Sequence, residues 1–157
     1  MNLFATSTCP IKSAEFLDDK RVVKMCLETA QLLSSALIMN GQPATYKLTH
    51  KNHPVSVWCR QTRDNYVWTL EHFKALLNEY KKRYNNVHAC SRLIPEFENG
   101  IKFIPEGNLQ KFVNCAANST LGISYKGIND TTKAYRLYLE DRWLNDKRTP
   151  TWYKVKK

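Results

Sequence analysis

The chain has 157 residues, with 24 Lys and Arg against 14 Asp and Glu and a formal net charge of +10. This length is enough for one domain with a core of its own. Hydrophobic and aromatic contents of 43% and 11% exclude a disordered chain, and no apolar run approaches the roughly 20 residues of a membrane span. The excess of positive charge favours an acidic partner: nucleic acid, a membrane surface or an acidic protein.

The first predicted helix runs from Ala14 to about Ile38, with Ser13 as its N-cap and Asn40-Gly41 ending it. Steps of three and four residues place an apolar stripe along this helix, which comprises Val22, Cys26, Ala30, Leu33 and Leu37. The same steps build a polar stripe on the other side, which comprises Arg21, Lys24, Glu28, Gln31 and Ser35. The pattern predicts an amphipathic helix that carries one carboxylate among cations on its outer face.

A polar loop over 42–53 precedes a second predicted helix. We expect this helix to begin at Pro54, because proline suits the first helical position. Apolar and aromatic side chains at steps of three or four residues extend it to Tyr84, which makes it about 30 residues or roughly 45 Å long. The basic run Lys81-Lys82-Arg83 near its end complements the negative end of the helix dipole.

The segment 85–128 is predicted to be irregular because it contains prolines and several Gly and Asn residues, with one or two short helices, for example around 107–117. Asp130 or Thr131 can cap a third helix that extends to about Leu144. No strand alternation, internal repeat or linker is evident in the sequence.

The last eleven residues, from Lys147 to Lys157, contain five positive charges, no acid and the aromatic pair Trp152-Tyr153. Together with the predicted helices they indicate an all-α fold. We expect residues 1–157 to form one compact helical bundle of three main helices, with long irregular connections and an ordered basic C-terminal tail.

The cysteines and histidines show no site of their own. Five widely spaced cysteines without a C-x-x-C pair fit neither a disulfide framework nor a zinc site, so we interpret them as small buried residues in a reducing compartment. The four histidines lack the H-E-x-x-H pattern. We therefore expect no metal and no cofactor. The first residues lack the pattern of a secretory signal, which favours a cytoplasmic location.

Glu28 on the polar stripe has two interpretations. On a solvated helix, Lys24 and Glu28 are an ordinary pair at positions i and i+4. On a surface that binds DNA, Arg21 and Lys24 would hold phosphates while the carboxylate faces a sugar or base. A carboxylate repels phosphate, so in such a groove it belongs to the chemistry rather than to binding.

The tail and the start of the second helix are also open to two interpretations each. Trp152 and Tyr153 among basic residues suit stacking on bases, but Trp152 can equally anchor the tail to the core. His53 before Pro54 can help to bind phosphate at a helix N-terminus or orient a carboxylate, or it can simply cap the helix.

These residues resemble a known family, the phage-encoded pyrimidine dimer DNA glycosylases, also called endonuclease V. The segment Asp19-Lys20-Arg21-Val22 followed by Glu28 is similar to that family's first helix, with the same spacing to its catalytic glutamate. The run Pro150-Thr151-Trp152-Tyr153-Lys154 is similar to its C-terminal motif, which follows an arginine, here Arg148. Bacterial relatives resemble the loop Asn52-His53-Pro54 before a tryptophan, and the run Tyr80–Asn85 resembles the end of the family's long middle helix.

The resemblance implies a small all-α DNA repair enzyme without metal that binds damaged duplex DNA as a monomer. In such enzymes the N-terminal amine attacks C1′ of the damaged nucleotide, a Schiff base forms, and β-elimination cuts the strand. By resemblance the catalytic groups here are Met1 and Glu28. The residues expected to contact DNA are Asn2, Arg21, Lys24, Gln31, His53, Arg148, Trp152, Tyr153 and Lys154. If the chain is encoded by a phage, its location is the cytoplasm of the host cell.

Three departures from the family pattern bear on specificity. Asn2 follows Met1 and protects it from removal, so that the nucleophile is the amine of Met1. Leu27 and Gln31 stand where the family has arginines beside its glutamate, which shifts phosphate binding to Arg21 and Lys24. Longer connections can alter the choice of lesion. A glycosylase for another modified base, a DNA-binding protein without catalysis and an RNA-binding protein therefore stay as alternatives.

Overall fold

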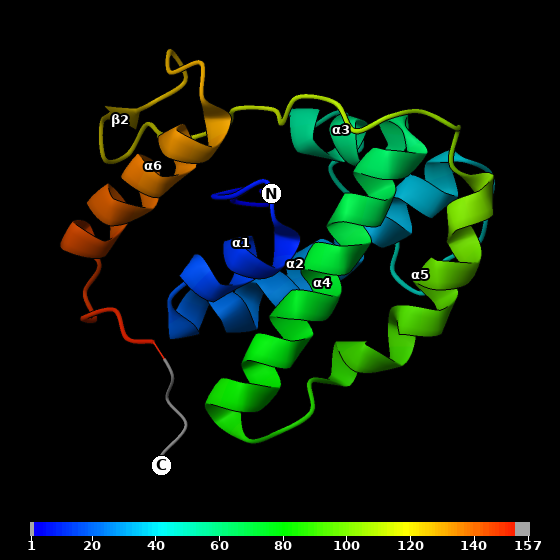
Figure 1. Ribbon diagram of the computed structural model, residues 1–157, viewed down its shortest axis with the longest axis horizontal. Helices are drawn as coiled ribbons and strands as arrows, with labels where there is room; N and C mark the ends of the chain where they lie inside the picture. Colours follow the sequence, from blue (N-terminus) through cyan, green and yellow to red (C-terminus); the bar gives the residue numbers. More distant parts are fainter. Residues whose placement is uncertain (1, 153–157) are drawn as a thin grey trace.

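A computed structural model describes residues 2–152 of the chain, and its regular structure is helical apart from one short hairpin (Figure 1). The six α-helices are α1 (Pro10–Phe16), α2 (Asp19–Met39), α3 (Pro54–Gln61), α4 (Arg63–Tyr84), α5 (Ile94–Gly100) and α6 (Thr131–Asn145). Two 3₁₀ helices, η1 (Ala89–Leu93) and η2 (Ile101–Phe103), flank α5. The strands β1 (Ala117–Asn118) and β2 (Ile123–Ser124) form one short antiparallel hairpin.

The helices α2 and α4 form the centre of the bundle, with α1 packed against α4 and α3 against both. Figure 1 shows α5 on one side of this centre and α6 on the other, with the N-terminal segment between α6 and the α3–α4 side. The core is built from fully buried side chains of these helices, which include Leu33, Leu70, Phe73, Leu76 and Phe97. Their burial supplies most of the driving force for this arrangement.

The all-α prediction is confirmed, and the three longest helices, α2, α4 and α6, each account for most of one predicted helix. Asn40 and Gly41 end α2 as expected, and Gly41 adopts a positive φ of 82°. Pro54 is the first residue of α3, and Asp130 caps α6 through its side chain, which accepts a hydrogen bond from the amide of Lys133. Local capping chemistry therefore determined these ends.

The first predicted helix is interrupted in the structure. α1 ends at Phe16 and α2 begins at Asp19, because Leu17 and Asp18 have extended backbones with ψ of 141° and 161°. The Leu17 side chain is fully buried, and its carbonyl oxygen accepts a hydrogen bond of 2.6 Å from Arg83. Tertiary contacts thus compensate for the helical hydrogen bonds that are missing at this corner.

Ser13, predicted as an N-cap, instead lies inside α1. Its hydroxyl accepts a hydrogen bond of 3.1 Å from the amide of Thr6 and donates one of 3.1 Å to the carbonyl of Phe4. The prediction of a cap was wrong because the N-terminal segment folds back onto α1. This contact fixes the path of that segment before α1 begins.

The second predicted helix is also divided, at Thr62. The Thr62 hydroxyl caps α4 by accepting a hydrogen bond of 3.1 Å from the amide of Asn65, and it donates one of 3.0 Å to the carbonyl of Asn108. The amide of Arg63 donates to the carbonyl of Pro105 at 2.7 Å. A Cβ at Gly107 would lie 2.8 Å from Thr62 Cγ2, so only glycine allows this segment to approach so closely.

The irregular segment forms three short helices at 89–103 rather than one around 107–117, and that part of the prediction was wrong. Residues 104–116 instead lie across α3 and α4. The carbonyl of Lys111 accepts a hydrogen bond of 3.0 Å from Trp58 Nε1, and the amide of Gln110 donates one of 2.9 Å to Asn65. These bonds hold an extended backbone, which a helix could not provide.

The helix α2 is long and apolar enough to cross a membrane by length and composition alone, although the sequence shows no unbroken apolar run. Twelve of its residues are buried inside the bundle. It is therefore the core helix of this fold, a class that passes the same test.

Candidate active site

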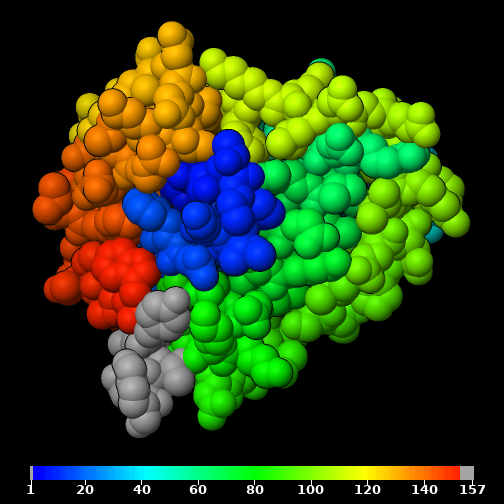
Figure 2. Space-filling view, in the orientation of Figure 1, coloured from blue at the N-terminus to red at the C-terminus, as the bar shows by residue number. Residues whose placement is uncertain are grey.

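The N-terminal segment is held in a strained turn beside α6. Phe4 adopts a φ of 52°, a left-handed conformation that a bulky side chain rarely takes. The Asn2 side chain stabilises the turn, because its Oδ1 accepts hydrogen bonds of 2.8 and 3.1 Å from the amides of Leu3 and Phe4. The Phe4 ring packs edge-on to Tyr135 and parallel to Tyr138, with ring centroids 6.2 and 6.1 Å away. In Figure 2 this blue segment reaches the surface between α6 and the helices coloured green.

Leu3 and Ala5 bring the same segment against the start of α3. They line one small apolar pocket together with Val55, Trp58 and Tyr135, to which Phe112 and Val113 also contribute. Asn2 Nδ2 donates a hydrogen bond of 3.5 Å to the carbonyl of Cys115. The beginning of the chain, the first turns of α3 and one face of α6 therefore meet at one place.

His53 caps α3 at this place, as one of its two interpretations predicted. Its Nδ1 accepts a hydrogen bond of 3.1 Å from the amide of Val55, so the neutral ring carries its proton on Nε2. Burial, together with the nearby positive charge of His50, lowers the pKa of His53. Its role toward phosphate stays a prediction.

Glu28 lies on the part of α2 that remains open to solvent. Its side chain is 22% exposed, and its Oε2 lies 3.6 Å from Nζ of Lys24, whose side chain is 71% exposed. Gln31, one turn further, is partly exposed. Within residues 2–152 no hydrogen bond joins Glu28 to Asn2 or His53. The carboxylate is thus neither fixed by a network nor neutralised by a buried partner, and it can accept a proton or face a developing positive charge.

Arg21, expected to hold a phosphate, is occupied by carboxylates of its own chain. Its Nη1 lies 3.1 Å from Asp18 and 3.0 Å from Asp146, and its Nη2 lies 3.4 Å from the other oxygen of Asp146. Its side chain is 11% exposed. In this state Arg21 fastens the end of α6 to the start of α2, and its predicted contact with DNA would require these bonds to open.

The C-terminal segment after α6 docks on the N-terminal end of α2. The Thr151 hydroxyl donates a hydrogen bond of 2.7 Å to Asp19, and the Thr151 carbonyl accepts one of 2.8 Å from the Asp19 amide. Trp152 Nε1 donates one of 3.0 Å to the carbonyl of Phe16, and the Trp152 ring packs edge-on to Trp143 at 4.9 Å. Trp152 therefore anchors the segment, while 39% of it stays exposed.

A groove of about 430 Å³ runs between the docked segment and α2. Three exposed cations line it, namely Lys20, Lys24 and Arg148. The acids that also line it are Asp18, Asp19 and Asp146, and each of these is paired with an arginine. The exposed charge of the groove is therefore positive, which suits a polyanion.

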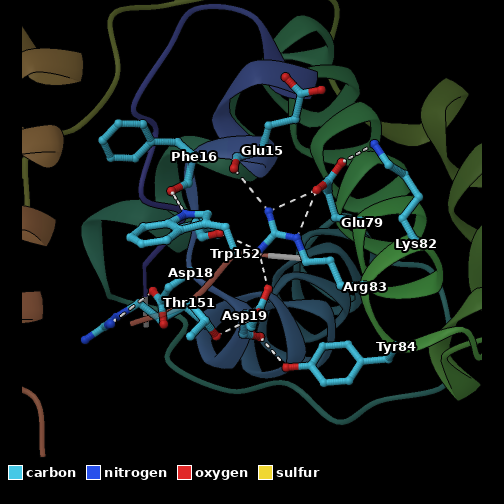
Figure 3. A network of polar contacts seen from close by, with 12 residues as sticks. Glu15, Phe16, Asp18, Asp19, Glu79, Lys82, Arg83, Tyr84, Thr151 and Trp152 are labelled. Atoms are coloured by element: carbon cyan, nitrogen blue, oxygen red, sulfur yellow. Dashed lines mark hydrogen bonds and ion pairs between the residues drawn. The ribbon is translucent and has the colours of Figure 1, made fainter. Parts of the chain in front are cut away.

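The wall behind this groove is a buried ionic network around Arg83 (Figure 3). Arg83 is fully buried, with Nη1 at 3.2 Å from Asp19 and Nη2 at 2.9 Å from Glu79. Its guanidinium also donates hydrogen bonds of 2.6 and 3.1 Å to the carbonyls of Leu17 and Glu15. Arg83 lies in the last turn of α4, as the basic run Lys81-Lys82-Arg83 predicted, but its burial and its ion pairs were not part of that prediction.

The sequence-predicted residues thus fall into two regions. Lys24, Glu28 and Gln31 share the open face of α2 with the docked Arg148 and Trp152 at one end, whereas Asn2 and His53 lie at the junction of the N-terminal segment with α3. Met1, Tyr153 and Lys154 lie outside the described residues. Sequence reasoning missed Asp19, Arg83 and Asp146, since only the fold brings these distant charges together.

A family model described as pyrimidine dimer DNA glycosylase matches residues 1–92, which include α1 to α4 with Glu28 and His53. No curated protein and no solved structure matches this chain. The match covers more than half of the sequence. DNA repair glycosylases bind DNA as their substrate, and the chain belongs to the pyrimidine dimer DNA glycosylase family.

Proposed function

We propose that this protein removes damaged bases, pyrimidine dimers foremost, from duplex DNA and then cleaves the strand as an abasic-site lyase. The N-terminal amine is the nucleophile and needs no cofactor. Its nitrogen bonds to C1′ while the glycosidic bond breaks and the base leaves with a proton. The C1′–O4′ bond then breaks, O4′ takes a proton, and the opened sugar is joined to the enzyme as a Schiff base. This Schiff base loses a proton from C2′, which expels the 3′ phosphate, and water then hydrolyses the C=N bond and releases the enzyme.

The observation that carries this proposal is the position of Glu28. It is the carboxylate on the open face of α2, it lies in the segment matched by the family, and its partner Lys24 is an exposed and weakly held cation. An α-amine with a reference pKa of about 7.7–8.0 is partly neutral, and so nucleophilic, near pH 7, and its reaction needs a group that moves protons. Glu28 suits that role because a carboxylate also stabilises positive charge developing on the sugar.

The cations of the groove support duplex DNA as the substrate. Lys20, Lys24 and Arg148 lie on the side of α2 that carries Glu28, and such cations gain affinity for a phosphate backbone by releasing counterions. We propose that the protein acts as a monomer in the cytoplasm on damaged or abasic sites, with Asn2, Gln31, His53, Trp152, Tyr153 and Lys154 among its DNA contacts.

Reductive trapping tests the proposal directly. The protein is incubated with ultraviolet-irradiated or abasic duplex and sodium borohydride, and the adduct is mapped by mass spectrometry. We expect a covalent adduct at the N-terminal residue, and a loss of base excision of at least about a hundredfold for Glu28→Gln. Glu71→Gln is the matched control, since Glu71 also faces a lysine of its own helix, Lys74, at 3.5 Å.

The outcomes separate the alternatives. Salt-sensitive DNA binding without any adduct, unchanged by Glu28→Gln, would identify a DNA-binding protein without catalysis. Excision from other modified pyrimidines but not from dimers would keep the reaction and change the substrate. An adduct on an internal lysine would keep the lyase class and replace the nucleophile.

A further inference from the structure

Two apolar side chains on α2 remain open to solvent next to Glu28. Val23 is 37% exposed and Leu27 is 40% exposed, although the other apolar residues over this stretch are at most 1% exposed. Their spacing of four residues places them on one edge of the helix, about 6 Å apart along its axis. We call this pair the α2 ridge.

Among residues 2–152, other segments cover α2 on both sides of the ridge, whereas Val23 and Leu27 themselves stay exposed. Toward the N-terminal end, Pro150 and Thr151 of the docked segment form one wall of the groove, which Val23 also lines. Toward the other end, the loop before α3 covers Ser35, whose hydroxyl donates to the carbonyl of Thr49 at 3.3 Å and accepts from its amide at 3.1 Å. The ridge is therefore an exposed part of α2 that lies between two covered parts of the same helix.

The charges around the ridge favour a polyanion as its occupant. Lys20 and Lys24 are exposed on the same helix face, between the ridge and the Glu28 side. Leu27 directly precedes Glu28, so its side chain flanks the carboxylate without covering it. A surface that combines cations, an aliphatic edge and one carboxylate matches a DNA strand, which offers phosphates, apolar base faces and a sugar.

We infer that the α2 ridge contacts the unstacked bases at the lesion and thereby discriminates damaged from intact duplex. This inference rests on the proposed function and assigns Leu27 and Val23 as specificity residues. When a base is damaged or extruded, a neighbouring base loses its stacking partner and exposes apolar surface. Aliphatic side chains that cover this surface offset part of the free energy of unstacking. Lys20 and Lys24 hold the flanking phosphates, which is a contact independent of sequence and damage.

The test compares Leu27→Ala and Val23→Ala with Met39→Ala, a control in the same helix whose side chain is equally exposed at 41% but lies at the far end. Affinities are measured for a duplex with a tetrahydrofuran abasic analogue and for the intact duplex, and 2-aminopurine beside the lesion reports unstacking. We expect Leu27→Ala to lower the ratio of the two affinities about tenfold, Val23→Ala about threefold, and Met39→Ala less than twofold. Leu27→Met, which keeps the apolar volume, retains the ratio within about twofold.

Several results overturn the inference. An unchanged ratio for Leu27→Ala does so, and so does an equal loss of affinity for both duplexes. A wild-type protein without preference for damaged DNA, or a ridge whose substitution abolishes self-association and leaves DNA binding intact, also contradicts it. Borohydride trapping on a preformed abasic site separates the two proposals. If wild type and Leu27→Ala both form the adduct and the ratio of affinities for damaged and intact duplex is unchanged, only the inference about the ridge is contradicted. Absence of the wild-type adduct contradicts the proposed reaction itself.

Discussion

Two pairs of oppositely charged residues at positions i and i+4 occupy very different environments in this protein. Glu79 and Arg83 on α4 are 3% and 0% exposed and lie 2.9 Å apart. Lys24 and Glu28 on α2 are 71% and 22% exposed and lie 3.6 Å apart. The sequence spacing is the same, but the surroundings assign one pair to structure and leave the other available for chemistry.

The difference follows from what else each pair contacts. Arg83 satisfies its guanidinium with two carboxylates and two carbonyls, so removing any partner leaves a buried charge uncompensated. Glu28 is partly exposed and lies 3.6 Å from the exposed Lys24, and losing such a pair costs little stability. A charged pair in a sequence therefore indicates a functional group only after burial is known.

Breaking the buried pair should have the largest effect on stability. Arg83→Met removes the buried cation that Asp19 and Glu79 share, so we expect it to lower the free energy of unfolding by about 3–5 kcal/mol. Urea denaturation followed by circular dichroism measures this loss. Lys81→Met, at an exposed position in the same helical turn, is the control and should change stability by less than about 0.5 kcal/mol. Equal midpoints for the two variants would show that the network contributes no more than a surface charge.

A buried neutral base should make stability depend on pH. His72 is fully buried against Trp68, and burial lowers its pKa to about 4. The unfolded chain binds a proton at this residue near pH 6.5, whereas the folded protein does not, so stability falls as pH drops from about 6.5 to about 4, by about 3 kcal/mol in total. Measuring urea midpoints across this range for wild type and His72→Gln isolates the effect. A parallel pH dependence in both proteins would refute it.

A smaller effect is expected where the docked C-terminal segment meets the buried network. Thr151→Val removes one hydrogen bond to Asp19, which should cost about 1 kcal/mol. Hydrogen exchange at the Asp19 amide, which donates to the Thr151 carbonyl, should become faster. Thr149→Val, at an exposed position two residues earlier, serves as the control. If both variants exchange alike, the side chain of Thr151 does not hold the segment.

The smallest effect on stability is expected at the exposed pair. Glu28→Gln should change the free energy of unfolding by no more than about 0.5 kcal/mol, because the contact with Lys24 is long and solvated. Thermal unfolding checks this, alongside the excision assay described above. A destabilisation comparable to that of Arg83→Met would mean that Glu28 is a structural residue after all.

The sequence was sufficient for the parts of the fold that local chemistry controls. Apolar periodicity identified the three long helices, Pro54 identified the start of α3, and Asp130 identified the start of α6. It failed where distant segments supply hydrogen bonds, at Leu17 and at Thr62. There the helix ends because Arg83 and residues 104–108 provide better partners than the helix itself.

The same division applies to the candidate site. The polar stripe with Glu28 could be found by spacing, since a helix determines which of its residues share a face. The pairing of Arg21 with Asp146 could not, because 125 residues separate them in sequence. We therefore predicted a phosphate-binding role for Arg21 without knowing that Asp18 and Asp146 are its partners in the folded chain.

The contacts of Asp19 constrain which substitutions this protein can accept during evolution. Its two carboxylate oxygens contact Arg83 and Thr151 separately, so the charge balance of the core and the attachment of the C-terminal segment depend on the same side chain. Substitutions at Arg83 and Thr151 should therefore show epistasis instead of adding independently. A lineage or a directed-evolution library that explores new C-terminal sequences would be free to vary Thr149, but it would have to retain a partner for Asp19.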